Sequence, residues 1–239
     1  MGTASTALVS TALLLIGGCA PRPLLDRAIA ARGGPLAGLT VRVEDQVHAE
    51  IPGTWHCTRT FLVPDRYAWK IITTADPIYH LFDGTTVRCF IGGAEVSSDT
   101  NPCAPLRSHA RWTAVVNLDA LRGPDVVLTP LDAAELPEGV REGLSARFPD
   151  GAVYRLGFDN RTLLVWARGP LDFSPFGKGE ASARFSDQRR AGPLVLPFAT
   201  SYAFGTTPLV DETVLAACVD PAGLTPASFT NPIGLPDCP

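Results

Sequence analysis

The sequence lacks the short motifs that mark the active sites of many enzymes. It has no Gly-x-Ser-x-Gly elbow, which would position an α/β-hydrolase nucleophile, and no glycine-rich phosphate loop between a strand and a helix. Histidines are few: His48, His56, His80 and His109 lack metal-site spacing, and we interpret them as exposed strand residues. These absences predict a non-catalytic protein with no metal and no cofactor. One alternative stays open, an enzyme in which His56, Cys57 and a carboxylate cluster in a cleft.

The sequence also lacks a large excess of acidic or basic residues. The 239 residues include 20 Lys or Arg and 24 Asp or Glu, which gives a formal net charge of -4, and no basic run exceeds Arg189-Arg190. Such a surface does not favour nucleic acid or an anionic membrane surface, so we expect neither as a partner. The hydrophobic content of 46% nevertheless indicates a folded core rather than disorder.

The N-terminus has the features of a secretory signal peptide over residues 1–18. Residues 4–18 carry no charged side chain, and their apolar core is too short to span a bilayer, which needs about 20 apolar residues in a helix. No Lys or Arg precedes this core. We expect export, although a buried hydrophobic helix stays open as an alternative.

The end of this segment, Ile16-Gly17-Gly18-Cys19, resembles a bacterial lipobox. In a lipobox the cysteine thiol is alkylated by a diacylglycerol, and the small residues let the backbone enter a narrow peptidase site. Ala20 does not resemble the retention signal of inner-membrane lipoproteins. The resemblance therefore implies a lipid anchor on Cys19 and a place in the cell envelope, at the outer membrane and facing the periplasm. An ordinary signal peptide with an accidental cysteine is the alternative.

Export would make the remaining cysteines candidates for disulfides. Cys89 and Cys103 bracket one loop, and Cys218 and Cys238 would pin the Pro-rich tail to the last strand. Cys57 would then be the odd thiol, buried and inert. Other pairings stay open, because connectivity does not follow from spacing alone.

Strand periodicity dominates the chain. Residues 40–51 alternate so regularly that Val41, Val43 and Val47 share one face, which only Asp45 interrupts. The same reasoning predicts further strands at 54–63, 66–71, 78–82, 86–91, 153–158, 162–168, 180–187, 194–204 and 212–219, and helices at 24–32, at 112–121 and within 132–147.

About eleven antiparallel strands with helices at the start and in the middle predict an α+β protein with one strongly curved sheet. We divide the chain into the signal peptide (1–18), the lipidated cysteine with a linker and the N-terminal helix (19–35), a sheet domain (36–219) with a helical insertion at about 106–147, and a Pro-rich tail (220–239). A two-domain arrangement with a break near residue 125 is the weaker alternative.

Two segments carry a family resemblance. Val63-Pro64-Asp65-Arg66-Tyr67-Ala68-Trp69, followed by Ile78-Tyr79-His80-Leu81-Phe82-Asp83-Gly84-Thr85-Thr86-Val87, resembles the LolA/LolB-like lipoprotein carriers. The order of the elements agrees with that family as well. The resemblance implies an open half-barrel of about eleven strands wrapped over helices. In that family the half-barrel encloses an apolar cavity that accepts acyl chains.

The sequence departs from the family at two positions. The arginine that precedes the motif proline, and that helps to hold the helical lid closed in the soluble carrier, is Val63 here; the aromatic after the Asp83-Gly84 turn is Arg88. Trp69 matches the family, and we expect it to fill core, with Asp83-Gly84 forming a tight turn. A lipid anchor also fits a membrane-bound acceptor better than a shuttling carrier.

The apolar face of a curved sheet must be covered, and two short helices over about eleven strands would leave a groove. Acyl chains gain about 0.8 kcal/mol per buried methylene, so such a groove can hold lipid. The candidates for its lining are Val41, Val43, Val47, Tyr67, Trp69, Ile71, Leu81 and Trp166. We therefore expect an anchored lipoprotein that binds or transfers lipid or lipoprotein acyl chains. The alternative is a structural or interaction lipoprotein with a closed cavity and an envelope protein as partner.

Overall fold

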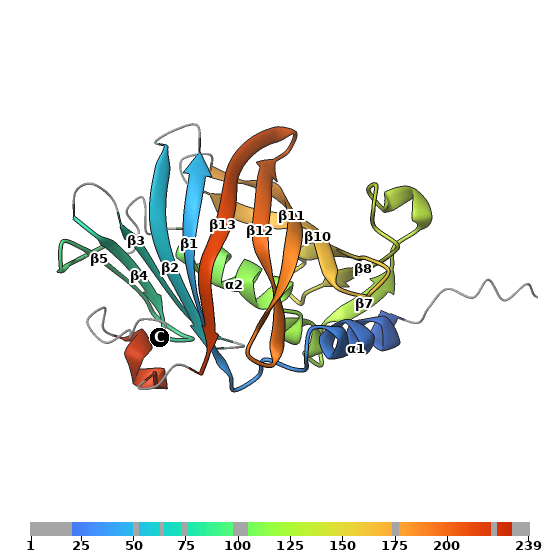
Figure 1. The fold of residues 1–239 in the computed structure, drawn as a ribbon, viewed down its shortest axis with the longest axis horizontal. Coiled ribbons are helices and arrows are strands. Elements are labelled where there is room, and N and C mark those ends of the chain that lie inside the picture. The colour runs from blue at the N-terminus through green and yellow to red at the C-terminus, as the bar shows by residue number, and fades with distance from the viewer. Residues whose placement is uncertain are drawn as a thin grey trace, which may run out of the picture.

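The computed structural model describes residues 21–49, 53–62, 65–72, 76–97, 105–173, 177–220 and 224–230. Over these residues the chain forms one antiparallel sheet of thirteen strands with two α-helices and three 3-10 turns (Figure 1). The elements are α1 (Pro21–Ala31), β1 (Thr40–Ala49), β2 (Thr54–Leu62), β3 (Arg66–Ile72), β4 (Ile78–Phe82), β5 (Val87–Ile91), β6 (Ala94–Val96), α2 (Leu106–Val116), η1 (Asp119–Arg122), β7 (Val127–Pro130), η2 (Ala133–Glu135), β8 (Glu142–Arg147), β9 (Val153–Phe158), β10 (Leu164–Phe173), β11 (Gly177–Ala191), β12 (Leu194–Phe204), β13 (Thr207–Val219) and η3 (Pro226–Phe229).

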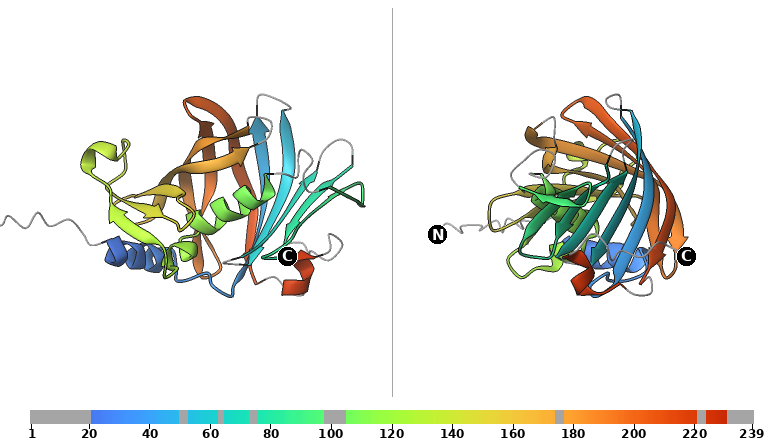
Figure 2. Two further views of the ribbon diagram at one scale, coloured as in Figure 1. Left: turned by 180° about the vertical axis from the view of Figure 1, so that it is seen from behind. Right: turned by 90° about the vertical axis from the view of Figure 1, so that its left-hand side faces the viewer.

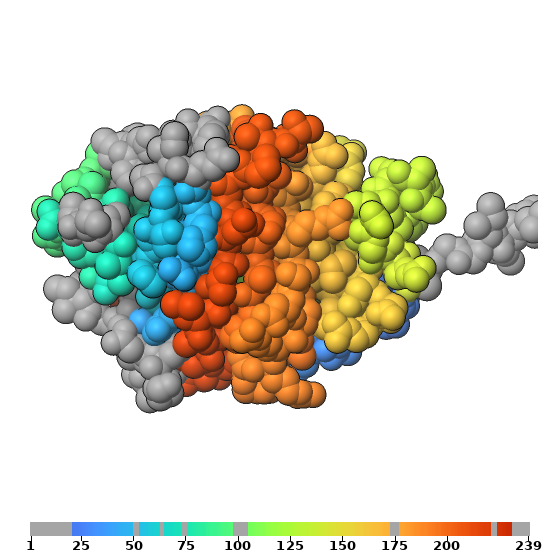
Figure 3. Space-filling model, turned by 45° about the horizontal axis from the view of Figure 1, so that its top comes forward, coloured from blue at the N-terminus to red at the C-terminus, as the bar shows by residue number. Residues whose placement is uncertain are grey.

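The first strand lies beside the last one. The strand order is β6-β5-β4-β3-β2-β1-β13-β12-β11-β10-β9-β8-β7, so two meanders meet where β1 pairs with β13. Figure 3 shows the blue β1 segment against the orange-red β13 segment on the outer surface. The sheet is strongly curved, and its edge strands are β6 and β7 (Figure 2). The predicted curved antiparallel sheet is confirmed, with thirteen strands in place of about eleven.

Helix α2 lies across the concave side of the sheet, here called the inner face (Figure 2). His109 of α2 stacks on Trp69 of β3 with ring centroids 5.3 Å apart. The backbone N–H of Asp172 donates to Ser108 Oγ at 2.8 Å, and Arg107 donates to the Thr85 carbonyl at 3.1 Å. Helix α2 is therefore fastened to both meanders, and it supports the middle of the half-barrel.

Alternation along β1 places the residues as predicted. Val41, Val43 and Val47 are buried on the inner face, and the charged Asp45 lies in the same row with 1% exposure. The register between β1 and β13 shifts between Glu44 and Asp45. A charge is therefore built into the middle of an apolar face.

The opposite side of the sheet, here called the outer face, is covered near β3–β5 by the C-terminal segment. Phe229 of η3 is 1% exposed and packs with Ala68, Leu81 and Phe90. Arg88 donates to the Thr230 carbonyl and pairs with Glu95, Nη2 to Oε2 at 2.8 Å. Arg88, which replaces the family's aromatic, therefore fastens this cover to the sheet.

Helix prediction was wrong in the middle of the chain. The expected helix at 112–121 begins at Leu106 and ends at Val116, because Leu118 adopts a left-handed φ of 65° and a 3-10 turn follows. The helix expected within 132–147 is a single turn, η2, followed by strand β8. Leu144 and Ala146 are both fully buried at a spacing of two, a strand pattern that the surrounding helix-forming residues concealed.

The histidine interpretation was also wrong in part. His48 and His56 are exposed on strands, as expected. His80 is 1% exposed, because it lies on the inner face of β4 beneath α2, and His109 belongs to α2 itself. Only two of the four are therefore exposed strand histidines.

Several predictions lie outside the described residues. These are the signal peptide at 1–18, Cys19, Val63, Cys103 and Cys238. The lipid anchor and the two disulfides therefore stay predictions. Cys57 is free and buried, as expected of the odd thiol. In the described part of the chain, no helix is long and apolar enough to cross a bilayer.

Candidate functional site

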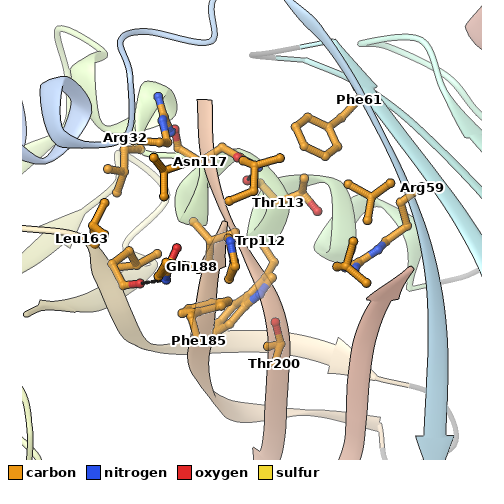
Figure 4. Close-up of a pocket in the computed structure, with 18 of the residues that line it drawn as sticks. Arg32, Arg59, Phe61, Trp112, Thr113, Asn117, Leu163, Phe185, Gln188 and Thr200 are labelled. Carbon is orange, nitrogen blue, oxygen red and sulfur yellow. Dashed lines mark hydrogen bonds between the residues drawn. The ribbon is translucent and has the colours of Figure 1, made fainter. Parts of the chain in front are cut away.

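A cavity, here called the main cavity, lies between the inner face and the helices. It encloses about 110 Å³, within about 890 Å³ of space free of protein atoms that also includes the open solvent at its mouth. Its walls come from α1, α2 and strands of both meanders, and they are chiefly apolar; Val43, Phe61, Trp112, Phe185, Leu196 and Val214 are examples. Figure 4 shows Trp112 and Phe185 side by side along it, with Arg32 and Asn117 at one end and Arg59 and Phe61 at the other.

A smaller side cavity of about 470 Å³ adjoins the main cavity. Five side chains line both cavities and form the wall between them: Arg59, Tyr67, Trp112, Thr113 and Tyr202. The wall therefore combines aromatic rings with one guanidinium. A change in the position of Trp112 or Thr113, both on α2, would join the two spaces.

The predicted groove residues divide into three groups. Val43 and Tyr67 line the main cavity, and Val47, Tyr67 and Trp69 line the side cavity. Val41 and Ile71 lie on the inner face but pack in its hydrophobic clusters without lining either cavity.

Leu81 and Trp166 lie on the outer face, so their assignment to the groove was wrong. Leu81 pairs with Ala68 on the neighbouring strand and packs beneath Phe229. Trp166 packs over Gly157 beside Val140, in the region of η2. The alternation of side chains along a strand does not say which face is concave, and this explains both errors.

A charged cluster, formed by Asp45, Arg59 and Glu212, lies on the inner face at the wall between the cavities. Arg59 Nη2 contacts Asp45 Oδ2 and lies 3.1 Å from Glu212 Oε2. The side chains are 0%, 21% and 11% exposed for Asp45, Arg59 and Glu212. Two carboxylates thus share one nitrogen of one guanidinium in a mostly apolar setting.

Burial sets the electrostatics of this cluster. Burial raises the pKa of Glu212 to about 7, against the attraction of Arg59 and with further help from the negative charge of Asp45. Burial also raises the pKa of Asp45, again opposed by Arg59. Asp45 Oδ1 and Arg59 Nε have no hydrogen-bond partner among the described residues. The cluster therefore retains both negative charge and unused hydrogen-bonding capacity.

Sequence reasoning missed this cluster, although its signal is visible. Each of three strands carries one charge within an otherwise apolar row: Asp45 lies between Val43 and Val47, Arg59 between Cys57 and Phe61, and Glu212 between Val210 and Val214. Only Asp45 was identified from the sequence as a charged residue on an apolar face. Bringing the three together requires the pairing of β1 with β13, which joins the two ends of the chain and leaves no local signature.

Most polar groups at the other end of the main cavity are engaged by the protein, although Arg32 Nε has no hydrogen-bond partner among the described residues. Arg32 pairs with Asp119 at 2.9 Å between Nη2 and Oδ2, and it also donates to the Gly34 carbonyl at 3.0 Å and to the Asn117 carbonyl. Gln188 donates to the Leu164 carbonyl at 3.1 Å. This end joins α1 to η1.

Trp69 lies between two histidines. His80 meets its ring edge-on at 5.5 Å, and His109 stacks on it. Burial lowers the pKa of each histidine to about 4, so both are neutral at pH 7. Trp69 fills core, as expected, and its ring also forms part of the side cavity.

The enzyme alternative is not supported by the geometry. His56 is exposed on β2, whereas Cys57 is buried and, as the next residue along the strand, points to the opposite face. Burial also raises the pKa of the Cys57 thiol, which disfavours the reactive thiolate. The described residues contain no group of three His, Cys, Asp or Glu side chains placed to hold a metal ion.

Comparison with known proteins identifies the fold. No protein-family model matches the sequence, and no curated protein matches it at a significant level. Among solved structures, a LolA superfamily protein from Nitrosomonas europaea superposes with a TM-score of 0.56 at 12% identity, covering 89% of this chain and 98% of that one. A DUF1329 family protein from Desulfovibrio piger gives a TM-score of 0.54 at 10% identity, covering 87% and 96%. The chain therefore has a LolA-like fold, as its motif predicted.

Proposed function

We propose that this LolA-like half-barrel binds an acyl chain in the main cavity, as an exported lipoprotein that receives or holds lipid. The observation that carries the proposal is the cavity itself, an apolar space that the inner face and the helices leave unfilled. Each methylene that enters it gains about 0.8 kcal/mol, so a long chain can be retained without specific polar contacts.

The proposal includes the lipid anchor on Cys19 and a location in the cell envelope, at the outer membrane and facing the periplasm. Its support is the lipobox-like segment Ile16-Gly17-Gly18-Cys19 and the absence of a retention signal at Ala20. A tethered protein cannot diffuse freely between membranes, so a receiving or holding role is favoured over that of a shuttle.

Native mass spectrometry after gentle purification tests chain binding. We expect co-purified lipid, and we expect uptake of a fluorescent acyl probe with an uncharged head group. Thr113→Trp should reduce uptake severalfold, since Thr113 lines both cavities and the indole would fill them. Leu215→Trp adds the same side chain at a residue that is 55% exposed and serves as the control. A protein without lipid that takes up no probe would instead be an interaction lipoprotein with a closed cavity.

Metabolic labelling with a palmitate analogue tests the anchor. The wild-type chain and the Cys57→Ala variant should be labelled, since Cys57 is buried and takes no part in anchoring. Cys19→Ala should lose the label and leave the membrane fraction. Equal labelling of Cys19→Ala and wild type would remove the anchor from the proposal, while the cavity would be unaffected.

A further inference from the structure

We propose that the charged cluster of Asp45, Arg59 and Glu212 is the head-group subsite of the main cavity, and that it selects long-chain amphiphiles whose polar end is a non-anionic hydrogen-bond donor. The preferred ligands would be long-chain amines and hydroxyl-bearing acyl compounds, whereas fatty-acid anions would be rejected. This inference rests on the proposed function, because it concerns the polar end of the chain whose apolar part occupies the cavity.

Position is the first argument. Arg59 lines both cavities, and Glu212 lines the side cavity. The opposite polar end offers less, because Asp119 and two carbonyls engage both terminal nitrogens of Arg32 and leave only its Nε, a donor, without a partner among the described residues. A chain lying along the apolar walls would therefore find its hydrogen-bonding partners at the charged cluster.

Unused hydrogen-bonding capacity is the second argument. Within the part of the chain that the structure describes, Asp45 Oδ2 and Glu212 Oε2 share one Arg59 nitrogen as ion-pair partners, and no other side chain hydrogen-bonds either oxygen. A buried acceptor with unused hydrogen-bonding capacity destabilises the protein, so a ligand that supplies a donor removes part of this penalty. A carboxylate has no donor to offer, whereas an ammonium or a hydroxyl does.

Net charge is the third argument. Two carboxylates face one guanidinium, and no nearby group among the described residues compensates for the excess negative charge. Tyr67 and Tyr202 are neutral, since burial raises the pKa of both phenols, and His109 and His80 are neutral because burial lowers theirs. Arg32 and Asp119 cancel one another at the far end of the cavity.

The excess charge separates the ligand classes. A protonated amine would balance it, whereas a fatty-acid anion would place a third negative charge in a site that water scarcely screens. A neutral hydroxyl compound should lie between the two, because it supplies the donor without the charge.

The test is a displacement assay with three ligands of equal chain length: hexadecylamine, monopalmitoylglycerol and palmitate, against an uncharged fluorescent probe at pH 8. The wild type should prefer the amine to palmitate by roughly tenfold or more, as expected for one partly screened charge. Glu212→Gln should shrink this preference by about tenfold at an unchanged side-chain shape. Asp211→Asn, at the exposed neighbouring residue of β13, should leave it unchanged.

If Glu212→Gln does not fold, the wild type supplies a second measurement. Lowering the pH from 8 to 6 protonates Glu212. The preference of the wild-type protein for hexadecylamine over monopalmitoylglycerol should therefore fall. Equal affinity for the three ligands, or a preference for palmitate, would overturn the inference and leave chain binding intact. Absence of probe uptake at any pH would count against the proposed function itself.

Discussion

Arg59 on β2 lies 3.1 Å from Glu212 on β13, Nη2 to Oε2, across the intervening strand β1. Asp45, on that intervening strand, contacts the same nitrogen. The three residues face the same way because Arg59 pairs with Val43 and Glu212 with Val47, which lie on either side of Asp45 on the same face of β1, so the cluster runs diagonally across three strands. A sheet that pairs its first strand with its last has thereby concentrated charge in the middle of an apolar wall.

Glu212→Gln should change how stability depends on pH. In the folded protein the pKa of Glu212 is raised from 4.5 to about 7, so between these values the folded state holds a proton that the unfolded state has lost. Wild-type stability should therefore decrease by a few kcal/mol relative to the variant as pH rises from about 4.5 to 7. Chemical denaturation at pH 5 and pH 8 measures it, and Asp211→Asn is the control. An equal change in stability between pH 5 and pH 8 in wild type and Glu212→Gln would contradict this.

His80 should produce the opposite dependence in acid. Its pKa is lowered to about 4 by burial, so below the unfolded value of 6.5 the unfolded state binds a proton that the folded state does not. Stability should fall between pH 6.5 and 4, by roughly 3 kcal/mol from this residue. His80→Phe should reduce this loss of stability, whereas His56→Phe, at an exposed position, should leave it unchanged. Denaturation curves measured between pH 6.5 and 4 test both expectations. Part of the loss should persist in His80→Phe, because His109 also has a pKa of about 4 in the folded protein.

Trp112→Ala should enlarge the binding space while weakening the fold. Trp112 is 4% exposed and lines both cavities, so its removal should cost about 3–5 kcal/mol of stability and join the two spaces. Acyl-probe capacity should rise and the melting temperature should fall. Phe229→Ala, on the outer face, should lower the melting temperature similarly without changing probe uptake. Equal uptake by both variants would show that Trp112 does not limit the cavity.

Cys57 should be unreactive in the native protein. It is 3% exposed, and burial raises the pKa of its thiol, so the thiolate that reacts with a disulfide reagent is scarce. Its labelling rate should follow unfolding and rise steeply in denaturant. Cysteine placed at the exposed neighbouring position, by His56→Cys in a Cys57→Ser background, should react at once. Rapid labelling of native Cys57 would contradict its burial in the folded protein.

Much of the fold could be predicted from the sequence, because strands and turns depend on local residue patterns. Alternation at 40–51 predicted β1, and strand 194–204 was predicted with both ends correct. The Asp83-Gly84 turn forms as expected: Asp83 Oδ1 accepts from the N–H groups of Thr85 and Thr86 at 2.9 and 2.8 Å. Residues of this kind act within their own segment, so no knowledge of the rest of the chain is needed.

The site was harder to predict because it depends on long-range pairing. The cluster of Asp45, Arg59 and Glu212 exists only when β1 pairs with both β2 and β13. Likewise, Leu81 and Trp166 have the composition of cavity residues, and only the direction of curvature places them outside. Periodicity defines two faces of a strand, whereas the fold decides which one is concave.

The two edge strands, β6 and β7, lie at opposite ends of the strand order. In a closed barrel, strand number and stagger fix the radius. No such closure condition holds for a sheet whose described strands end at β6 and β7, so its width is set by what packs inside it. Substitutions of inner-face side chains can therefore change the width of the concave side without breaking a hydrogen bond between strands. Evolution could therefore adjust the size of the space on the concave side by single substitutions, with the strand order unchanged.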